Sequence, residues 1–365
     1  MTRLLGGFAR AESPSFDKAA VDRFGRIVAA EWKWRGTSVT LLRQSHRGDH
    51  IRAEWHPRNN RAREQILVLG HLDTVYAAGT IAQMPFRVSR GRAWGPGTFD
   101  MKGGLVIALY AVDALAAAGF VPKKRIVFLW TSDEEIGSET SRGVIESEAR
   151  RSNAVLVLEP ALGLDGRVKT GRKGVGEIEL IAIGRAAHAG LNPEDGINAI
   201  EEIALQIARI AQWTEPRRGI TVNAGMIEGG TRTNVIPERA RALIDVRASR
   251  PEDMRALEQK FRALRPILKG AKLEVRGGFS RPPMERKTSV ALYEKARTLS
   301  KEMGITLGEA FVGGGSDGNF TAALGVPTLD GLGAIGEGAH SPRENVVVRA
   351  LPERAALMAG LLASL

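Results

Sequence analysis

Runs of consecutive aliphatic residues recur along the first half of the chain, and glycine or polar side chains follow each run. Because neither face of these runs is polar, they predict strands of a sheet that is buried on both sides. The runs lie at about 65–69, 125–130 and 154–158. Apolar residues at helical spacing predict helices at about 14–34 (with Ser15 as N-cap), 105–118, 289–303 and 352–362. We therefore predict an α/β fold with a mostly parallel sheet and helices on both faces.

The pattern changes near residue 173. Residues 174–183 alternate between apolar and polar side chains, which is typical of a strand with one exposed face. A helix, two strands, a helix and a strand are then predicted at 198–213, 220–227, 239–246, 251–264 and 272–275. This β-α-β-β-α-β order describes an α+β two-layer sandwich of the ferredoxin-like kind. We expect residues 173–281 to form an inserted domain, and residues 1–172 and 282–365 to form one discontinuous domain.

Histidine and acidic residues follow each of the three predicted buried strands. They include His71, Asp73, Glu134, Glu135 and Glu159. Any one of them could simply satisfy hydrogen bonds in a turn. Because the carboxyl ends of parallel strands lie at one edge of a sheet, however, all of them should converge there, where α/β proteins bind ligands. The adjacent acids after the second strand would repel one another unless a cation lay among them.

Two further residues extend this set. Asp100 lies in the glycine-rich segment 93–104 ahead of a helix, where an Asp can also act as a simple N-cap. His340 ends a glycine-rich loop near the C-terminus. Mixed histidine and carboxylate ligation suits Zn²⁺ and tolerates Co²⁺ or Mn²⁺. The groups are too many for one tetrahedral ion, so they favour two ions with a bridging carboxylate and one uncoordinated carboxylate as general base.

Composition narrows the function classes. The chain has 365 residues and no cysteine, which excludes disulfides, thiolate nucleophiles and cysteine-ligated zinc. The formal net charge of +11 raises the possibility of nucleic-acid binding. The basic residues are scattered over separate loops, however, including Arg58, Arg61 and Arg63, and aromatic residues make up only 5% of the chain. Stacking platforms are therefore scarce, and we expect no nucleic-acid partner.

Neither a transmembrane run nor a signal peptide is evident, so we expect a cytoplasmic protein without a membrane partner. A trimmed secreted form would have the same sequence. His46, His50 and His56 lie among charged loop residues without an acidic neighbour at a strand end. We do not expect these three histidines to be metal ligands.

Five stretches of the chain, in this order, resemble the M20 metallopeptidases and most strongly the glutamate carboxypeptidases of that family. They are GHLDTV at 70–75, GTFDMKGG at 97–104, SDEEIGS at 132–138, LEP at 158–160 and AHS at 339–341. The resemblance implies a dizinc site in which Asp100 bridges the ions. His71 and Glu159 would bind one zinc ion, and Glu135 and His340 the other. Glu134 would be the general base, and Asp73 would orient His71.

The same resemblance assigns roles in the inserted domain, which would be a lid and dimerisation domain. His188 would reach into the active site of the partner subunit and stabilise the oxyanion. Three more residues match positions that contact substrate, with the two arginines binding a substrate carboxylate. These are Asn234, Arg247 and Arg281. Residues 313–319 match a glycine-rich substrate loop.

The resemblance implies a homodimeric dizinc exopeptidase that hydrolyses the amide bond of a small peptide or N-acyl amino acid, next to a free carboxylate. The product would be C-terminal glutamate or a similar residue. An N-acyl-amino-acid amidohydrolase or a dipeptidase with the same metal site is the alternative. A non-catalytic binding protein that kept the fold is a further alternative, although the intact Glu134 and ligand set argue against it.

Overall fold

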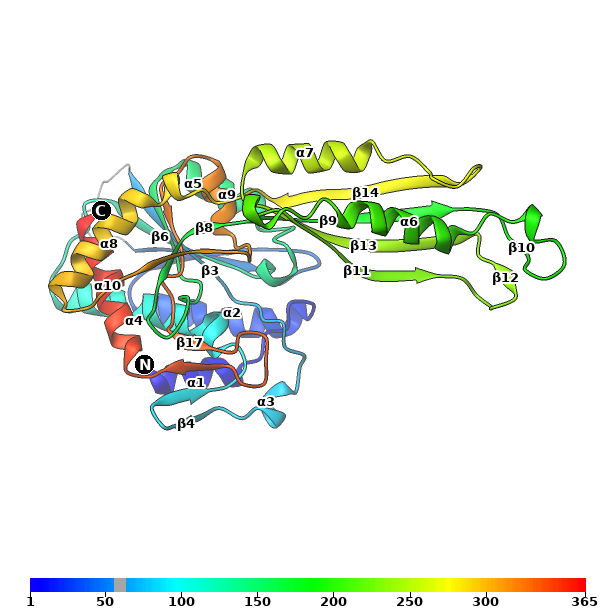
Figure 1. Cartoon of the computed structure of the whole chain (residues 1–365). Helices are drawn as coiled ribbons and strands as arrows, with labels where there is room; N and C mark the ends of the chain where they lie inside the picture. Colours follow the sequence, from blue (N-terminus) through cyan, green and yellow to red (C-terminus); the bar gives the residue numbers. More distant parts are fainter. Residues whose placement is uncertain (56–63) are drawn as a thin grey trace. The chain divides into compact units, whose positions relative to one another are not determined.

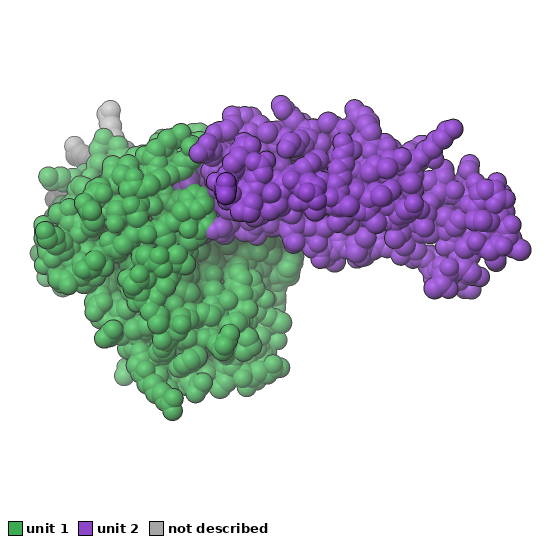
Figure 2. Space-filling model, viewed as in Figure 1, with its two compact units in different colours: residues 1–171, 285–312, 316–365 green, residues 172–284, 313–315 purple. Residues whose placement is uncertain are grey.

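The computed structural model describes residues 1–55 and 64–365, so His56, Arg58, Arg61 and Arg63 lie outside the described residues. The chain divides into two compact units (Figure 2). Unit 1 comprises Met1–Gly171, Glu285–Val312 and Ser316–Leu365, and unit 2 comprises Arg172–Met284 and Gly313–Gly315. Three glycines of the expected substrate loop therefore group with unit 2. The catalytic and dimerisation roles of the two units stay predictions.

Unit 1 contains a six-stranded sheet. Its strands are, in spatial order, β1 (Ser38–Leu42), β2 (His50–Trp55), β6 (Arg125–Thr131), β3 (Gln65–His71), β7 (Ser152–Val157) and β16 (Thr328–Leu329). The last four run parallel to one another, whereas β2 is antiparallel to both β1 and β6. The mostly parallel sheet is thus confirmed, and it places the carboxyl ends of β3, β6 and β7 side by side.

Helices cover both faces of this sheet (Figure 1). Ile66 and Val68 of β3 enter one hydrophobic core, which they share with α1 (Thr2–Arg10), α2 (Lys18–Trp34), α4 (Gly103–Ala117), α8 (Val290–Glu302) and α10 (Ala350–Ser364). Leu67 and Leu69 point to the other face and pack with α5 (Arg142–Arg150) and α9 (Gly318–Ala323). Burial on both sides explains the uninterrupted apolar run of this strand.

The sequence pattern missed several elements of unit 1. Helix α1 was not predicted, and Ser15 does not cap α2, because the Asp17 side chain accepts the Ala20 amide there. Short strands also form a four-stranded sheet and a separate pair, and α3 is a single turn. These elements are β17 (Gly336–Glu337), β18 (Asn345–Val347), β5 (Arg92–Trp94), β4 (Arg87–Ser89), β8 (Val168–Arg172), β15 (Glu309–Val312) and α3 (Thr80–Gln83). Strands this short carry no readable alternation.

Unit 2 is a two-layer sandwich. Its antiparallel sheet has the order β11 (Thr221–Gly229), β13 (Arg239–Ala248), β9 (Gly174–Ile183) and β14 (Lys272–Arg281). Helices α6 (Ala199–Ala211) and α7 (Pro251–Arg262) pack on it through one hydrophobic core. A two-stranded ribbon of β10 (Ala187–His188) and β12 (Val235–Ile236) completes the unit (Figure 1). Within the described ranges of both units, every helix is too short or too polar to cross a lipid bilayer.

Candidate active site

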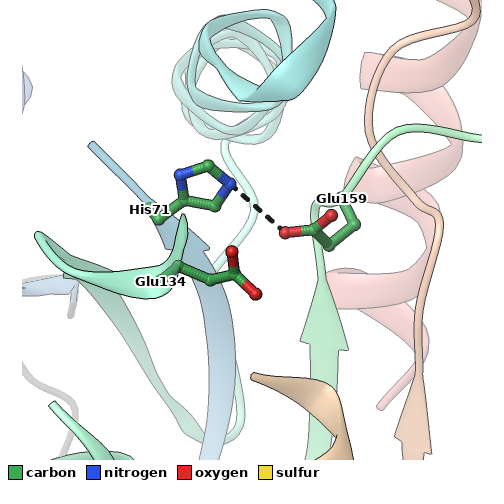
Figure 3. Close-up of side chains that lie close together, drawn as sticks. All are labelled: His71, Glu134 and Glu159. Carbon is green, nitrogen blue, oxygen red and sulfur yellow. Dashed lines mark ion pairs between the residues drawn. The ribbon is translucent and has the colours of Figure 1, made fainter. Parts of the chain in front are cut away.

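The carboxyl ends of three adjacent strands bring together the first group of predicted site residues (Figure 3). His71 is the last residue of β3, Glu134 lies in the turn after β6, and Glu159 follows β7. The Nε2 atom of His71 lies 3.4 Å from Oε1 of Glu159. One donor atom from each of the three residues lies within 4.8 Å of the other two, a spacing that could hold a metal ion.

Asp100 connects this group to a second one. Its Oδ1 lies 3.3 Å from Nε2 of His71, and its Oδ2 lies 3.4 Å from Nε2 of His340. The same His340 nitrogen lies 3.2 Å from Oε2 of Glu135. The two oxygens of one carboxylate therefore face two different imidazoles, and each imidazole also faces a further carboxylate. The structure thus brings together the predicted ligands from strand-end loops and from a loop more than 150 residues away in sequence.

The pKa values of the clustered side chains indicate that positive charge is favoured among them. Burial of the His71 ring opposes protonation, but Asp100 and two further carboxylates raise the pKa of His71 well above its ordinary value. Hydrogen bonds with Asp100 and Glu135 raise the pKa of His340 to about 10. Burial favours the neutral form of Asp100, yet the two imidazoles hold its pKa well below the ordinary range. The carboxylates around these rings thus favour positive charge at the cluster, and bound cations would supply it.

The donor set fits a metal. Within the described residues, three buried atoms at this cluster find no hydrogen-bond partner of acceptable geometry: His71 Nε2, Asp100 Oδ1 and Glu135 Oε1. Donor atoms of these three residues also lie within 4.8 Å of one another. Imidazole nitrogen and carboxylate oxygen are ordinary ligands of Zn²⁺ and are accepted by Co²⁺ and Mn²⁺.

Asp73, which was expected to orient His71, also binds the turn that carries Glu134 and Glu135. Its carboxylate oxygens accept the backbone amides of Glu134 and Glu135, each at 3.2 Å. The hydroxyl of Ser15 donates to Oδ2 of Asp73 at 2.7 Å, so the residue expected to cap a helix supports the site instead. No local pattern could reveal this role, because 58 positions separate Ser15 from Asp73.

Two positions near the site must be glycine, because neighbouring atoms leave no room for a Cβ atom. A Cβ atom on Gly70 would lie 2.5 Å from the methyl carbon of Met101, whose sulfur accepts the His71 amide. A Cβ atom on Gly104 would lie 2.4 Å from the carbonyl oxygen of Leu158. Both glycines therefore allow the Asp100 segment to approach the strand ends. The peptide bond between Asp100 and Met101 is cis.

Residues 67–364 match the sequence profile of peptidase family M20/M25/M40. The chain belongs to this family. Carboxypeptidase G2 of Pseudomonas sp. (strain RS-16) is 33% identical over 363 residues, covering 97% of this chain and 86% of the relative. Succinyl-diaminopimelate desuccinylase of Dechloromonas aromatica (strain RCB) is 30% identical over 317 residues, covering 81% and 82%. A solved tripeptidase from Staphylococcus aureus subsp. aureus Mu50 has the same fold, with a TM-score of 0.82 at 20% identity, covering 100% and 98%.

Membership of the M20 family confirms the resemblance that the five stretches indicated and makes the chain a metallopeptidase of that family. The family is metal-dependent, and residues that could bind a metal are present at the sheet edge. Two of the histidines that were not expected to be ligands lie within the described residues. One of them, His50, is buried and contacts Ser132 and Thr140 instead.

The remaining predicted residues of this M20 chain lie in unit 2, where they form two pairs. His188 and Asn234 lie next to each other at the β10–β12 ribbon, because His188 pairs with Val235 and the neighbouring Ala189 amide donates to the Asn234 carbonyl at 3.0 Å. The Nδ1 atom of His188 accepts the amides of Gly190 and Leu191, each at 3.1 Å. A neutral ring held this way carries its proton on Nε2, which is then a hydrogen-bond donor.

Arg247 and Arg281 form the second pair. Both pair with Val175 of β9, one from each side, although the register of β14 shifts just before Arg281. The side chains of Val175 and Arg281 both lie beside Gly315, and Arg247 reaches Gly313, so the three side chains point to the same face of the sheet. The guanidinium of Arg247 donates to both carboxylate oxygens of Asp245 and to the Gly313 carbonyl. These contacts use three of its five N–H groups, so within the described part of the chain two remain for a further acceptor.

Proposed function

We propose that the chain is a dizinc exopeptidase. It hydrolyses the amide bond next to a free carboxylate and releases C-terminal glutamate or a similar amino acid. The single observation that supports this most strongly is Asp100, whose two oxygens face the imidazoles of His71 and His340 at 3.3 and 3.4 Å. A carboxylate in this position suits a bridge between two ions.

In this proposal His71 and Glu159 hold one ion, and Glu135 and His340 hold the other. When bound, such a pair lowers the pKa of a water molecule and polarises a carbonyl group. Glu134 is the general base. Its buried carboxylate lies beside His71 and Glu159, where it can take the proton of the attacking water and deliver it to the leaving nitrogen. Asp73 fixes the turn that carries this base through the Glu134 amide.

Specificity for a free carboxylate comes from the arginine pair. Arg247 and Arg281 lie at one level of the unit 2 sheet and point to one face. Guanidinium groups bind carboxylates with two parallel hydrogen bonds, which selects a planar anion over a neutral amide. The identity of carboxypeptidase G2 to this chain, 33% over 363 residues, supports a carboxypeptidase reaction.

The length of β9 supports a site shared between two copies of the chain. The arginine pair flanks Val175, near the start of β9, whereas the His188–Asn234 pair lies beyond its end at Ile183. Eight residue steps of an extended strand separate these two points, or about 26 Å. A glutamyl substrate is too short to touch both pairs. If both bind one substrate, they come from different subunits.

Strand β11 offers the surface for this homodimer. It is an edge strand of the unit 2 sheet, and its residues from Asn223 onward are exposed. Met226 and Ile227 are each 53% exposed. An edge strand presents unpaired N–H and C=O groups that can pair with another chain. We propose that β11 of two copies join in this way.

A substrate panel tests the proposed reaction. Zinc-loaded protein is assayed with N-acyl-glutamates, with other N-acyl amino acids and with dipeptides, and release of the free amino acid is measured. We expect the highest kcat/KM for N-acyl-glutamates. The same compounds with an amidated C-terminus are the matched controls and should be poor substrates. Equal cleavage of the amidated compounds would contradict recognition of a free carboxylate.

The alternative is an N-acyl-amino-acid amidohydrolase or a dipeptidase with the same metal site. The desuccinylase of Dechloromonas aromatica, 30% identical over 317 residues, favours the first of these, because its name describes removal of an acyl group. The same panel separates the candidates. Preference for the acyl group rather than for glutamate would favour the amidohydrolase, and preference for dipeptides would favour the dipeptidase.

A further inference from the structure

Glu344 is a fully buried carboxylate four residues after His340. Its Oε1 accepts the backbone amides of Phe99 and Asp100, at 2.7 and 2.9 Å. Its Oε2 accepts the amide of Gly97 at 3.0 Å. One side chain therefore binds three amides of the turn that carries Asp100, including the amide of Asp100 itself.

Tyr76 brings a third segment into this contact. Its hydroxyl donates to Oε2 of Glu344 at 2.5 Å and also lies 3.0 Å from the carbonyl oxygen of Ser341. Tyr76 is three residues after Asp73, and Ser341 is adjacent to His340. The loop after β3, the Asp100 turn and the C-terminal histidine loop thus meet at the Glu344 carboxylate.

We propose that Glu344, supported by Tyr76, is a positioning residue that holds Asp100 between His71 and His340. None of these contacts joins Glu344 to a proposed metal ligand side chain. Both of its oxygens bind the three backbone amides and the Tyr76 hydroxyl. It acts by fixing the backbone from which the Asp100 carboxylate projects. The inference rests on the proposed metal-dependent function, because the alignment of Asp100 matters most when its two oxygens bind two ions.

The chemistry of the contact explains why a carboxylate is needed. Four donors converge on two oxygens, and a carboxylate is an acceptor only. A glutamine has the same size, but its NH₂ group would face some of these N–H and O–H donors and could not accept from them. Those donors would then lose their hydrogen-bond acceptor. Glu344→Gln therefore changes the hydrogen bonding of the Asp100 turn with almost no change in volume.

The test uses three variants of the full chain. Glu344→Gln breaks the contact, and Tyr76→Phe removes only the hydroxyl. Glu337→Gln is the matched control, because Glu337 lies in the same segment, is half-exposed and pairs with Arg92. Hydrogen–deuterium exchange of residues 95–102 is measured on metal-free protein. Zinc affinity is measured by competition with a chromogenic chelator.

We expect Glu344→Gln to exchange faster at residues 95–102 and to bind zinc about 10–100-fold more weakly. Tyr76→Phe should change both quantities in the same direction by less, and Glu337→Gln should change neither. A merely structural role would lower the melting temperature of Glu344→Gln and leave the zinc affinity of the folded protein unchanged, which would overturn the proposal. If Glu344→Gln does not fold, Tyr76→Phe decides the question. The proposal would be overturned if Tyr76→Phe had the same zinc affinity and the same exchange rates as the wild-type protein.

These readouts separate the inference from the proposed reaction. A wild-type protein that binds zinc but cleaves no member of the substrate panel would contradict the proposed function. The effect of Glu344→Gln on exchange and on zinc affinity would still decide the role of Glu344.

Discussion

The Nδ1 atom of His71 lies 3.0 Å from the backbone carbonyl oxygen of Asp73 and 3.5 Å from the nearer oxygen of its carboxylate. A carbonyl acceptor on Nδ1 leaves Nε2 free of its proton in the neutral ring, so Nε2 can serve as the ligand atom. The carboxylate of Asp73 also accepts the amides of Glu134 and Glu135. The same residue thus orients a proposed ligand and the turn that carries the proposed base.

Asp73→Asn should lower kcat/KM by about 10–100-fold, because outer partners of metal ligands typically contribute this much. The carbonyl contact to His71 remains, but an NH₂ group replaces one acceptor of the Glu134 and Glu135 amides. Steady-state kinetics on the zinc-loaded enzyme measures the effect. Asp165→Asn is the control, since the Asp165 side chain is 64% exposed. Activity of Asp73→Asn equal to that of the control would refute this role.

Glu134→Gln should retain two equivalents of zinc and lose turnover by about 10²–10⁴-fold, the usual contribution of a general base. Metal content after dialysis and kcat are measured on the same sample. Glu139→Gln is the control, because the Glu139 side chain is 77% exposed and lies five positions downstream. Loss of zinc from Glu134→Gln would instead make Glu134 a ligand, as its spacing to His71 and Glu159 allows.

His188→Ala should lower kcat and leave the zinc content unchanged, because Nε2–H of His188 would stabilise an oxyanion in the partner's site. Mixing His188→Ala with inactive Glu134→Gln tests the shared site. Random reassociation makes half of the dimers mixed, and each mixed dimer has one complete site. About a quarter of wild-type activity should therefore return. A mixture no more active than its components would show that each subunit works alone.

Met226→Asp should disrupt the proposed β11 pairing, because a charge would then lie at the centre of the interface. Light scattering after gel filtration should show a change from dimer to monomer, and activity should fall together with the dimer if His188 acts across subunits. Val121→Asp is the control, since Val121 is 62% exposed in unit 1. A dimeric Met226→Asp protein would place the interface elsewhere.

Removal of metal should destabilise the protein, because the acids of the cluster then face one another without cations. Adding zinc at about 100 times its Kd should raise the free energy of unfolding by about 2.7 kcal/mol per site. Differential scanning calorimetry of chelator-treated and zinc-loaded protein measures the shift. Asp100→Ala should show a much smaller shift, and a shift equal to that of wild type would exclude Asp100 as a ligand.

The buried strands β3, β6 and β7 of unit 1 and the acids that follow them could be predicted directly from the sequence. A strand buried on both faces needs an uninterrupted apolar run, and β3 has one from Ile66 to Leu69. Parallel strands place their carboxyl ends at one edge, so the sequence alone predicts that His71 and Glu159 converge. The element order of unit 2 followed from its alternating strands in the same way.

The contacts that organise the site depend on the tertiary structure. Ser15 reaches Asp73 across 58 positions, and Glu344 reaches Asp100 across 244 positions. Such contacts have no period along the chain, because they form only when distant loops pack together. The local sequence pattern indicates which strands are buried and in which direction they run. This is enough to place the His71, Glu134 and Glu159 side chains at one edge of the sheet. The resemblance of segment 97–104 to the M20 motif already implied Asp100 as the bridging group. Its contact with Glu344, by contrast, arises only from the packing of loops that lie far apart in the sequence.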